Sequence, residues 1–461
     1  MNAPANADAV VKDPLGFWLE WAGKVRFEDL PGEVVDASKT FLLNTSAAML
    51  AGSTAPGAPE VVRQVREWGG DPQSTVAASG FKAPAPMAAL ANGVMAHAMD
   101  YDDTQAGTGL HANVVVVPAV LAMSETLPRA SGRDLLLAHA LGLELACRMT
   151  LAATNRGAHP WLTTTLFGIF GAALAAGKIA GLDAAQLRHA LGIVYSSSAG
   201  NRQGLLDGTL IQRVQPGLCA KSAVEAVALA RQGVTGAHDV LGGRYGLYPS
   251  HYGDDYAPAA LTSGLGSDFR MLDIGLKPYP CCSYSQEPLD AMLDLVREHA
   301  IVPGAVESIA VCVVSKHAAG LVDHPYSPRS CPQVDAQFSM QYVIASAVCR
   351  GAFGIAELQD KALREPAVLE FSSCISVAVD PQREGQVSVR LRDGRVLEKR
   401  VPIARGHPSR PFSAAELHRK VEECAMHAVV PRTPAQVAAL EQGIASLERS
   451  ERGAVLAELL A

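Results

Sequence analysis

AHAMDYDDTQAGTGLHANVVVVP, residues 96–118, is the most informative stretch of this chain. It places two histidines and three aspartates directly before four valines, residues 114–117, and Pro118. Acidic and imidazole groups beside an apolar run predict a polar site on a buried wall. Burial and neighbouring charges shift pKa values most strongly in such places, so the stretch is a candidate for proton-transfer chemistry.

Around this stretch, residues 14–265 are predicted to be mostly helical. Alanine and leucine are abundant there, and the alternation typical of strands is rare. Residues 133–153 are apolar nearly all round, which predicts a buried helix. Residues 167–180 are small and apolar, as in closely packed helices, and Asp183 is a candidate N-cap for a helix at 184–196.

The pattern changes near residue 265. The expected elements are strands at 308–315, 375–380, 387–391 and 396–401 and helices at 289–299 and 336–349. Asp393-Gly394 is a hairpin signal between the last two strands. After Pro402 the chain returns to helix, and Ser413 and Glu416 form a capping-box pattern at its start.

These elements predict a mainly α protein with two domains. We expect a large all-helical domain, residues 1–265 plus 403–461, into which a smaller α+β domain, residues 266–402, is inserted. Clefts between domains are common ligand sites.

Composition excludes several classes of protein. A net charge of −7 over 461 residues gives no basic face for nucleic acid, although a local basic pocket can still hold an anionic substrate. Nine scattered cysteines favour reduced thiols over a disulfide framework. The first dozen residues do not resemble a signal peptide, and no apolar run has membrane-spanning length. We therefore expect a cytoplasmic protein without nucleic-acid or membrane partners.

Further segments carry residues suited to proton transfer or anion binding. They are residues 156–160 with 163–165, residues 198–203, residues 215–221 and residues 277–282. His159 lies just before a predicted helix start, where anions are attracted. Lys221 follows a Pro-Gly break and is expected to begin an Ala-rich helix, where it can meet a carboxylate as a point charge. Each feature alone is equally compatible with an ordinary solvated or buried side chain, and this also holds for His97.

Taken in order, these segments resemble the MmgE/PrpD family. Residues 96–104 are similar to the family run A-H-A-x-D-[FY]-D-D-T, residues 198–203 match S-A-G-N-R-Q, and residues 277–280 match K-x-[YF]-P. The similarity extends over nearly the whole chain. It implies a helical domain, a smaller α+β lid, an active site in the cleft between them, and a homodimer.

The resemblance also implies the residues of that site. The catalytic candidates are Asp100, His111, His159, Lys221 and Lys277, and the substrate-binding candidates are Thr104, Arg202, Tyr279 and Tyr326. The histidines would transfer protons, the lysines would neutralise charge, and Asp100 would orient one of them. In residues 323–328, His324 is an alternative to Tyr326.

The chain departs from the family pattern after residues 277–282. Many members continue with R-Y-T-H, whereas this chain has Ser283 and Gln286 at the arginine and histidine positions. Without this arginine the chain lacks a side chain that can donate two parallel hydrogen bonds to one substrate carboxylate. This argues against a tricarboxylate and for a substrate with one carboxylate fewer.

Motifs for cofactors are not found in the sequence. Residues 171–178, GAALAAGK, have the wrong spacing for a P-loop, and Cys281 and Cys282 belong to no C-x-x-C set for an iron–sulfur cluster. We therefore expect neither a cofactor nor a metal ion, with catalysis by side chains alone.

In the reactions of the family, negative charge develops on a carbon next to a carboxylate, and the enzyme must stabilise that charge. A lysine must neutralise that charge, and a histidine can take or return the proton. The first hypothesis is a cofactor-independent lyase, a dehydratase of the 2-methylcitrate type that acts on a small hydroxylated di- or tricarboxylate. The alternatives are an epimerase or racemase of a dicarboxylate such as iminodisuccinate, a decarboxylase of the cis-aconitate type, and a non-catalytic carboxylate binder.

Overall fold

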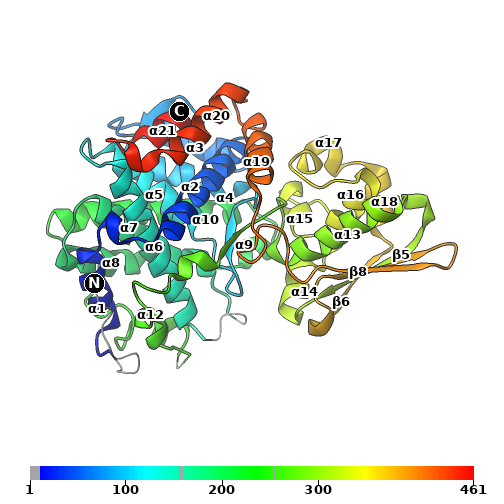
Figure 1. The fold of residues 1–461 in the computed structure, drawn as a ribbon, viewed down its shortest axis with the longest axis horizontal. Coiled ribbons are helices and arrows are strands. Elements are labelled where there is room, and N and C mark those ends of the chain that lie inside the picture. The colour runs from blue at the N-terminus through cyan, green and yellow to red at the C-terminus, as the bar shows by residue number, and fades with distance from the viewer. Residues whose placement is uncertain (1–10, 155–158, 254) are drawn as a thin grey trace.

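The structure is a computed structural model that describes residues 11–154, 159–253 and 255–461. Residues 1–10 at the N-terminus and Arg156–Ala158 of the segment before His159 lie outside the described residues. The described chain is mainly α-helical, as predicted. Figure 1 shows most helices gathered in one large part and a smaller part of helices and strands beside it.

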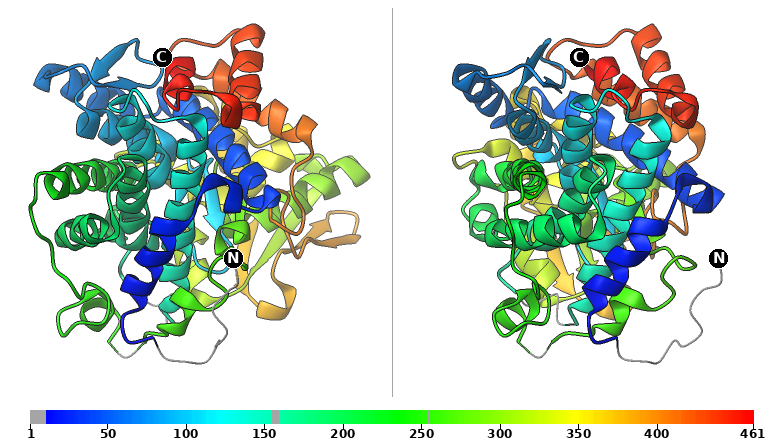
Figure 2. Two further views of the ribbon diagram at one scale, coloured as in Figure 1. Left: turned by 60° about the vertical axis from the view of Figure 1, so that its left-hand side comes forward. Right: turned by 90° about the vertical axis from the view of Figure 1, so that its left-hand side faces the viewer.

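The larger part is built from both ends of the chain. Its helices are α1 (Pro14–Lys24), α2 (Gly32–Gly52), α3 (Ala58–Trp68), α4 (Ala85–Ala98), α5 (Asn113–Glu125), α6 (Gly132–Ala152), α7 (Thr163–Ile179), α8 (Ala184–Val194), α9 (Gln203–Leu206), α10 (Ile211–Arg231), α11 (Leu247–His251), α12 (Ala259–Thr262), α19 (Ala414–Met426), α20 (Pro434–Ala445) and α21 (Val455–Leu460). Helices α19 and α20 both pack on α2, so the C-terminal helices close the N-terminal core (Figure 2).

Close packing inside this core depends on small residues. Gly142 of α6 and Gly171 of α7 face each other, and a Cβ on either would collide with the carbonyl oxygen of the other. Among the described helices, α6 is the one long and apolar enough to cross a membrane, but 94% of its apolar window is buried inside the protein. The buried helix predicted at 133–153 is therefore confirmed.

Several helix ends follow the local sequence as predicted. Asp183 caps α8 by accepting a hydrogen bond from the backbone N–H of Gln186. Ser413 and Glu416 form the reciprocal capping box of α19. Each cap satisfies backbone N–H groups that have no partner within the helix.

The helix start expected at Lys221 is wrong. Helix α10 begins at Ile211 and runs through Pro216 and Gly217, so Lys221 lies in its middle. Gly217 packs against Gly93 of α4, where a Cβ on Gly93 would come within 2.7 Å of the Gly217 Cα. The glycine therefore permits close helix packing and does not end a helix.

The smaller part contains a four-stranded sheet in the order β6-β5-β7-β8. Its strands are β5 (Val306–Val313), β6 (Ile375–Val379), β7 (Gln386–Leu391) and β8 (Val396–Arg400). Strands β5 and β6 are parallel, and the other pairs are antiparallel. The hairpin predicted at Asp393-Gly394 is confirmed, with Gly394 at a φ of +90°.

Six α-helices of the described chain belong to the smaller part. They are α13 (Gln286–His299), α14 (Lys316–Val322), α15 (Pro332–Gln337), α16 (Met340–Arg350), α17 (Asp360–Leu363) and α18 (Pro366–Ser372). Helix α13 packs on β7 and β8, and α16 packs on β6 (Figure 1). The single helix expected at 336–349 is wrong, because the chain breaks after Gln337 and Ser339 caps α16.

Short strands add a third correction, because part of the region expected to be all-helical is extended. The strands there are β1 (Ser74–Val76), β2 (Phe81–Ala83) and β3 (Asp103–Gln105). Strand β3 pairs antiparallel with β4 (Ile274–Leu276), and the backbone N–H of Lys277 then donates to the Asp102 carbonyl at 3.1 Å. This pairing brings the Lys277 segment beside the aspartates of the opening stretch.

Candidate active site

A cavity of about 600 Å³ is lined by both the larger and the smaller part. The larger part contributes the loop after β3, the start of α7, and side chains of α10. The smaller part contributes the segment after β4, the start of α13, and α14. The acidic, basic and imidazole groups that line it are His97, Asp100, His111, Arg202, Lys277, Glu287, His317, Glu384, Arg405 and His407.

Lys277 is a buried cation held by two carboxylates. Its Nζ lies 2.5 Å from Asp100 Oδ1 and 3.6 Å from Asp102 Oδ1, and the residue is 2% exposed. Asp100 has a φ of +50°, a left-handed conformation that turns the chain out of α4. Burial alone would lower the pKa of Lys277, but Asp100 and Asp102 outweigh it and raise that pKa above its ordinary value. Lys277 is therefore a permanent ammonium ion.

Asp102 also holds two imidazole rings. Its Oδ2 lies 3.0 Å from His111 Nδ1 and 3.2 Å from His97 Nδ1. Gln212 Nε2 donates to His97 Nε2 at 3.1 Å, so His97 carries its proton on Nδ1 and donates it to Asp102. His111 lines the cavity, and within the described residues its Nε2 makes no hydrogen bond. His111 therefore presents a free ring nitrogen to a ligand.

The cluster shifts the pKa values of its members in opposite directions. Burial alone would raise the pKa of Asp102, but His111, Lys277 and His97 outweigh it and hold that pKa well below its usual range. Burial alone would lower the pKa of His111, but the Asp102 carboxylate outweighs it and raises that pKa. Asp102 stays ionised, whereas His111 holds a proton more readily than an ordinary imidazole does.

Four donor groups of this cluster have a spacing that suits a metal ion. Ligand atoms of His97, Asp100, Asp102 and His111 all lie within 4.8 Å of one another. However, the Lys277 ammonium already contacts both carboxylates, and both histidines direct Nδ1 at Asp102. A second cation at this place would meet the charge of Lys277 directly. The donor set therefore fits the ammonium ion better than a metal ion.

A second set of lining groups is suited to anions. An Arg202 N–H donates to His317 Nε2 at 2.7 Å, so this ring nitrogen accepts and carries no proton. Burial, together with the Arg202 charge, lowers the pKa of His317. The start of α7 also lines the cavity, and its N-cap residue Leu162 offers no side-chain acceptor to the first N–H groups. A helix start of this kind favours a bound carboxylate.

The two positions that depart from the family pattern have different surroundings. Ser283 lines the cavity and brings no charge to it. The Gln286 side-chain amide donates to the carbonyl of Cys281 at 2.8 Å and to that of Tyr279 at 3.2 Å. Gln286 therefore stabilises the turn that follows Lys277.

The structure brings five of the nine predicted site residues to this cavity. They are Asp100, Thr104, His111, Arg202 and Lys277. The other four lie elsewhere: His159 packs against Tyr252, Lys221 pairs with Glu225, Tyr279 bonds to Asp290, and Tyr326 packs against Tyr342. His324, the alternative to Tyr326, bonds to the Gly320 carbonyl. Roles of these residues in catalysis stay predictions.

Sequence reasoning missed several groups of the site. Asp102 and His97 lie in the opening stretch, but nothing local shows that one carboxylate serves both imidazoles and a distant lysine. His317 lies in none of the motifs identified in the sequence. Glu287 lines the same cavity, and burial, with the nearby Glu384, raises its pKa to about 7.

An ionised carboxylate, an ammonium ion and an open imidazole nitrogen in one enclosed site define a protein suited to proton transfer on an anionic molecule. Comparison with protein families shows the family to which the chain belongs. The chain belongs to the MmgE/PrpD family: the MmgE/PrpD N-terminal domain matches residues 19–259, and the MmgE/PrpD C-terminal domain matches residues 279–444.

Curated relatives of this chain include enzymes. It is similar to the cis-aconitate decarboxylase of Homo sapiens, with 27% identity over 85% of this chain and 83% of that protein. The cis-aconitate decarboxylase of Mus musculus is 26% identical over 95% of this chain and 91% of that protein. That of Aspergillus terreus is 28% identical over 64% of this chain and 62% of that protein.

Proposed function

We propose that this chain is a cofactor-independent lyase that acts on a small hydroxylated di- or tricarboxylate. The observation that carries the proposal is the position of Asp102, which holds the cavity-facing His111 through one oxygen and lies beside Lys277 with the other. A base and a cation are thereby fixed next to each other in one enclosed site.

His111 is the proposed base. Its Nε2 takes a proton from the carbon next to a substrate carboxylate. Asp102 holds the Nδ1 proton, fixes the tautomer and stabilises the imidazolium that forms. Positioned general-base catalysis of this kind contributes about 10²- to 10⁴-fold in rate.

Lys277 is the proposed stabiliser of the developing charge. Removing a proton next to a carboxylate places a second negative charge on the same group, which a buried ammonium ion neutralises most effectively. Asp100 orients that ammonium ion at 2.5 Å. The hydroxyl group then leaves as water with a proton from an acid of the same cavity, where Glu287 has a pKa of about 7.

Arg202 and the start of α7 are the proposed carboxylate-binding groups, with Thr104 as a hydrogen-bonding partner of the substrate. Because Ser283 adds no charge where related sequences often have arginine, a dicarboxylate suits this cavity better than a tricarboxylate.

Decarboxylation of a cis-aconitate-like molecule is the second candidate, and the activities of the curated relatives favour it. In that reaction the bond to a carboxylate breaks, carbon dioxide leaves, and the electron pair remains on carbon beside the Lys277 charge. His111, protonated before the reaction, then donates a proton to that carbon. Epimerisation uses the same base without a leaving group.

Proton NMR in D2O separates these reactions. The purified protein is incubated without added metal with 2-methylcitrate, citrate, cis-aconitate, iminodisuccinate and several 2-hydroxy acids. New vinyl signals indicate dehydration, a lost carboxylate with released carbon dioxide indicates decarboxylation, and deuterium exchange alone indicates epimerisation. The His111→Gln variant controls for contaminating enzymes. Tight binding of a carboxylate with no turnover and no exchange would indicate a non-catalytic binder and overturn the proposal.

The remaining expectations are also proposals. We propose that residues 266–402 form a lid over residues 1–265 and 403–461. A cavity lined by both parts supports this proposal.

We further propose a cytoplasmic homodimer. The nine cysteines are all free in the structure, which suits a reducing compartment.

A further inference from the structure

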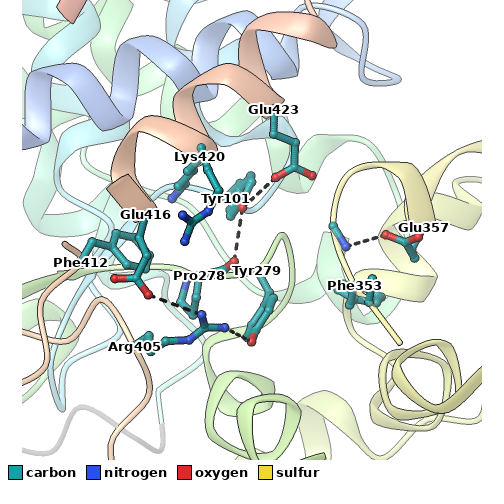
Figure 3. Close-up of a pocket in the computed structure, with 13 residues that line it drawn as sticks. Tyr101, Pro278, Tyr279, Phe353, Glu357, Arg405, Phe412, Glu416, Lys420 and Glu423 are labelled. Carbon is teal, nitrogen blue, oxygen red and sulfur yellow. Dashed lines mark hydrogen bonds and ion pairs between the residues drawn. The ribbon is translucent and has the colours of Figure 1, made fainter. Parts of the chain in front are cut away.

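A second cavity lies behind the segment that carries the active-site lysine. It has a volume of about 300 Å³ and is lined by Tyr101, Pro278 and Tyr279 together with residues of α19 and of the loop after α16. Figure 3 shows Lys420 and Glu423 reaching into it from α19, with Phe353 and Glu357 on another side. No step of the proposed reaction uses this cavity.

The carboxylates that line this cavity already have donors. Glu423 accepts from the Tyr101 hydroxyl at 3.1 Å (Figure 3). It also accepts from the Ile355 N–H at 2.8 Å. The other two are satisfied as well: Glu416 accepts from Ser413 and pairs with Arg405, and Glu357 accepts from the Gly354 N–H. None of the three is left to bind a cation.

Two of the lining cations, in contrast, have no carboxylate partner among the described residues. Arg419 is exposed at this cavity and makes neither an ion pair nor a hydrogen bond in the described chain. Lys420 is 5% exposed, and its Nζ donates only to the Lys277 carbonyl, at 2.7 Å. Burial lowers the pKa of Lys420 to about 8, because it outweighs the nearby Asp102 and Glu423 carboxylates, which raise it. An anion would supply the missing partner for both groups.

Aromatic rings make up much of the remaining lining. Lys420 Nζ lies 4.1 Å from the centre of the Tyr101 ring and 5.8 Å from that of Phe412, and Phe353 also faces the cavity. Apolar rings beside two unpaired cations suit an organic anion with a flat or bulky apolar body better than a small inorganic ion.

The same groups hold the backbone of the active site. Lys420 donates to the carbonyl of Lys277, and the Tyr101 hydroxyl lies 3.3 Å from the carbonyl of Pro278 (Figure 3). A ligand that draws the Lys420 ammonium toward itself loosens the residue whose side chain carries the charge of the active site.

We propose that this second cavity is a binding site for a small carboxylate with an apolar body, and that its occupation lowers turnover at the Lys277 site. The binding does not depend on the reaction assigned above, whereas the effect on turnover rests on the proposed function. The experiment therefore distinguishes a failure of the binding proposal from a failure of the proposed effect on turnover.

Benzoate is the probe, and isothermal titration of the purified full-length chain is the measurement. We expect benzoate to bind the wild-type chain and to bind Arg419→Gln at least tenfold more weakly. The matched control is Arg392→Gln, an exposed arginine of the β7–β8 hairpin outside both cavities, and it should bind as the wild type does. Since Arg419 is exposed, its replacement leaves the fold intact, which circular dichroism checks.

Arg202→Gln distinguishes the two cavities. Benzoate binding that survives in Arg202→Gln and weakens in Arg419→Gln supports the second site. No binding to the wild-type chain, or loss in Arg202→Gln with retention in Arg419→Gln, would overturn it. Binding of inorganic phosphate as tightly as benzoate would overturn the assignment to an organic anion.

The effect on turnover is tested once a substrate is identified. Benzoate should lower kcat of the wild type, and an unchanged kcat at saturating benzoate would rule out the proposed coupling.

Discussion

The Nδ1 of His111 and the Oδ2 of Asp102 lie 3.0 Å apart, while the other nitrogen of His111 is free at the cavity. The same carboxylate oxygen accepts from His97, and the other oxygen lies near Lys277. Asp102 is fully buried, so its charge acts on these groups without the screening that water would provide. One carboxylate thus sets both the orientation and the basicity of the proposed base.

Asp102→Asn should lower kcat at least about 100-fold, because His111 loses the partner that fixes its tautomer. The pH profile should also move. His111 works as a base when neutral, so activity rises with pH through the His111 pKa. Asp102 raises that pKa, so its removal should shift the rising limb to lower pH. The profile of kcat/KM against pH measures both effects.

Asp103→Asn is the matched control. Asp103 is equally buried and adjacent in sequence, but its carboxylate accepts from Asn113 and does not line the cavity. We expect its rising limb to move less than that of Asp102→Asn, because Asp102 raises the pKa of His111 more than Asp103 does. An unshifted limb in Asp102→Asn would show that His111 is not the base.

Lys277→Met should lower the free energy of unfolding by about 3–5 kcal/mol, since it leaves Asp100 and Asp102 buried without a cation. The double variant Asp100→Asn/Lys277→Met should recover part of this loss because one of the two unpaired charges is gone. Lys221→Met is the control, as its pair with Glu225 is a partly exposed i,i+4 contact worth about 0.3–0.5 kcal/mol. Urea denaturation measures all three, and equal losses for Lys277→Met and Lys221→Met would contradict the buried pair.

Local signals account for the part of the fold that was predicted well. Asp183 before α8, Ser413 before α19 and Gly394 in the β7–β8 hairpin each act within a few residues of themselves. Gly217 was misinterpreted because its neighbour in space is α4, which the sequence around it does not reveal. The break after Gln337 has a similar cause, since the Gln337 side chain donates to the Met99 carbonyl in the distant opening stretch.

The only residues of the site that were predicted are ones that lie in family motifs. Asp100, His111 and Lys277 lie in such motifs and meet in the cavity. The shared role of Asp102 depends on the β3–β4 pairing, which joins segments about 170 residues apart, and no local pattern specifies that register. His317 enters the site through its contact with Arg202, which links the smaller part to the larger one.

Arg202→Gln should raise KM about tenfold or more with kcat changed less than threefold, because a charged hydrogen bond to a substrate carboxylate contributes about 1.5–3 kcal/mol. His317→Gln should raise KM less, since His317 only supports the guanidinium. Arg383→Gln is the control, being an exposed arginine paired with Asp380 outside the cavity. A fall in kcat at constant KM in Arg202→Gln would instead place Arg202 at the reacting carbon.

Chelation should leave the activity intact, because Lys277 already supplies the cation that Asp100 and Asp102 require. The protein is dialysed against EDTA, its metal content is measured, and kcat is compared before and after. Loss of activity that returns on adding one divalent metal would show that His97, Asp100, Asp102 and His111 act as metal ligands.

Glu287→Gln should stabilise the protein at alkaline pH and not at acidic pH. Burial raises the pKa of Glu287 to about 7, from an ordinary value near 4.5, so the folded chain favours the protonated form. That stability is fully present below pH 4.5 and is lost as the pH rises through 7. Glutamine stays neutral throughout, so the variant should gain about 3 kcal/mol over the wild type at pH 8, at about 1.4 kcal/mol for each pKa unit, and nothing at pH 4.5. Glu370→Gln, an exposed glutamate on α18, should show no such difference. Urea denaturation at the two pH values measures the gain, and an equal effect at both would show that folding does not shift the pKa of Glu287.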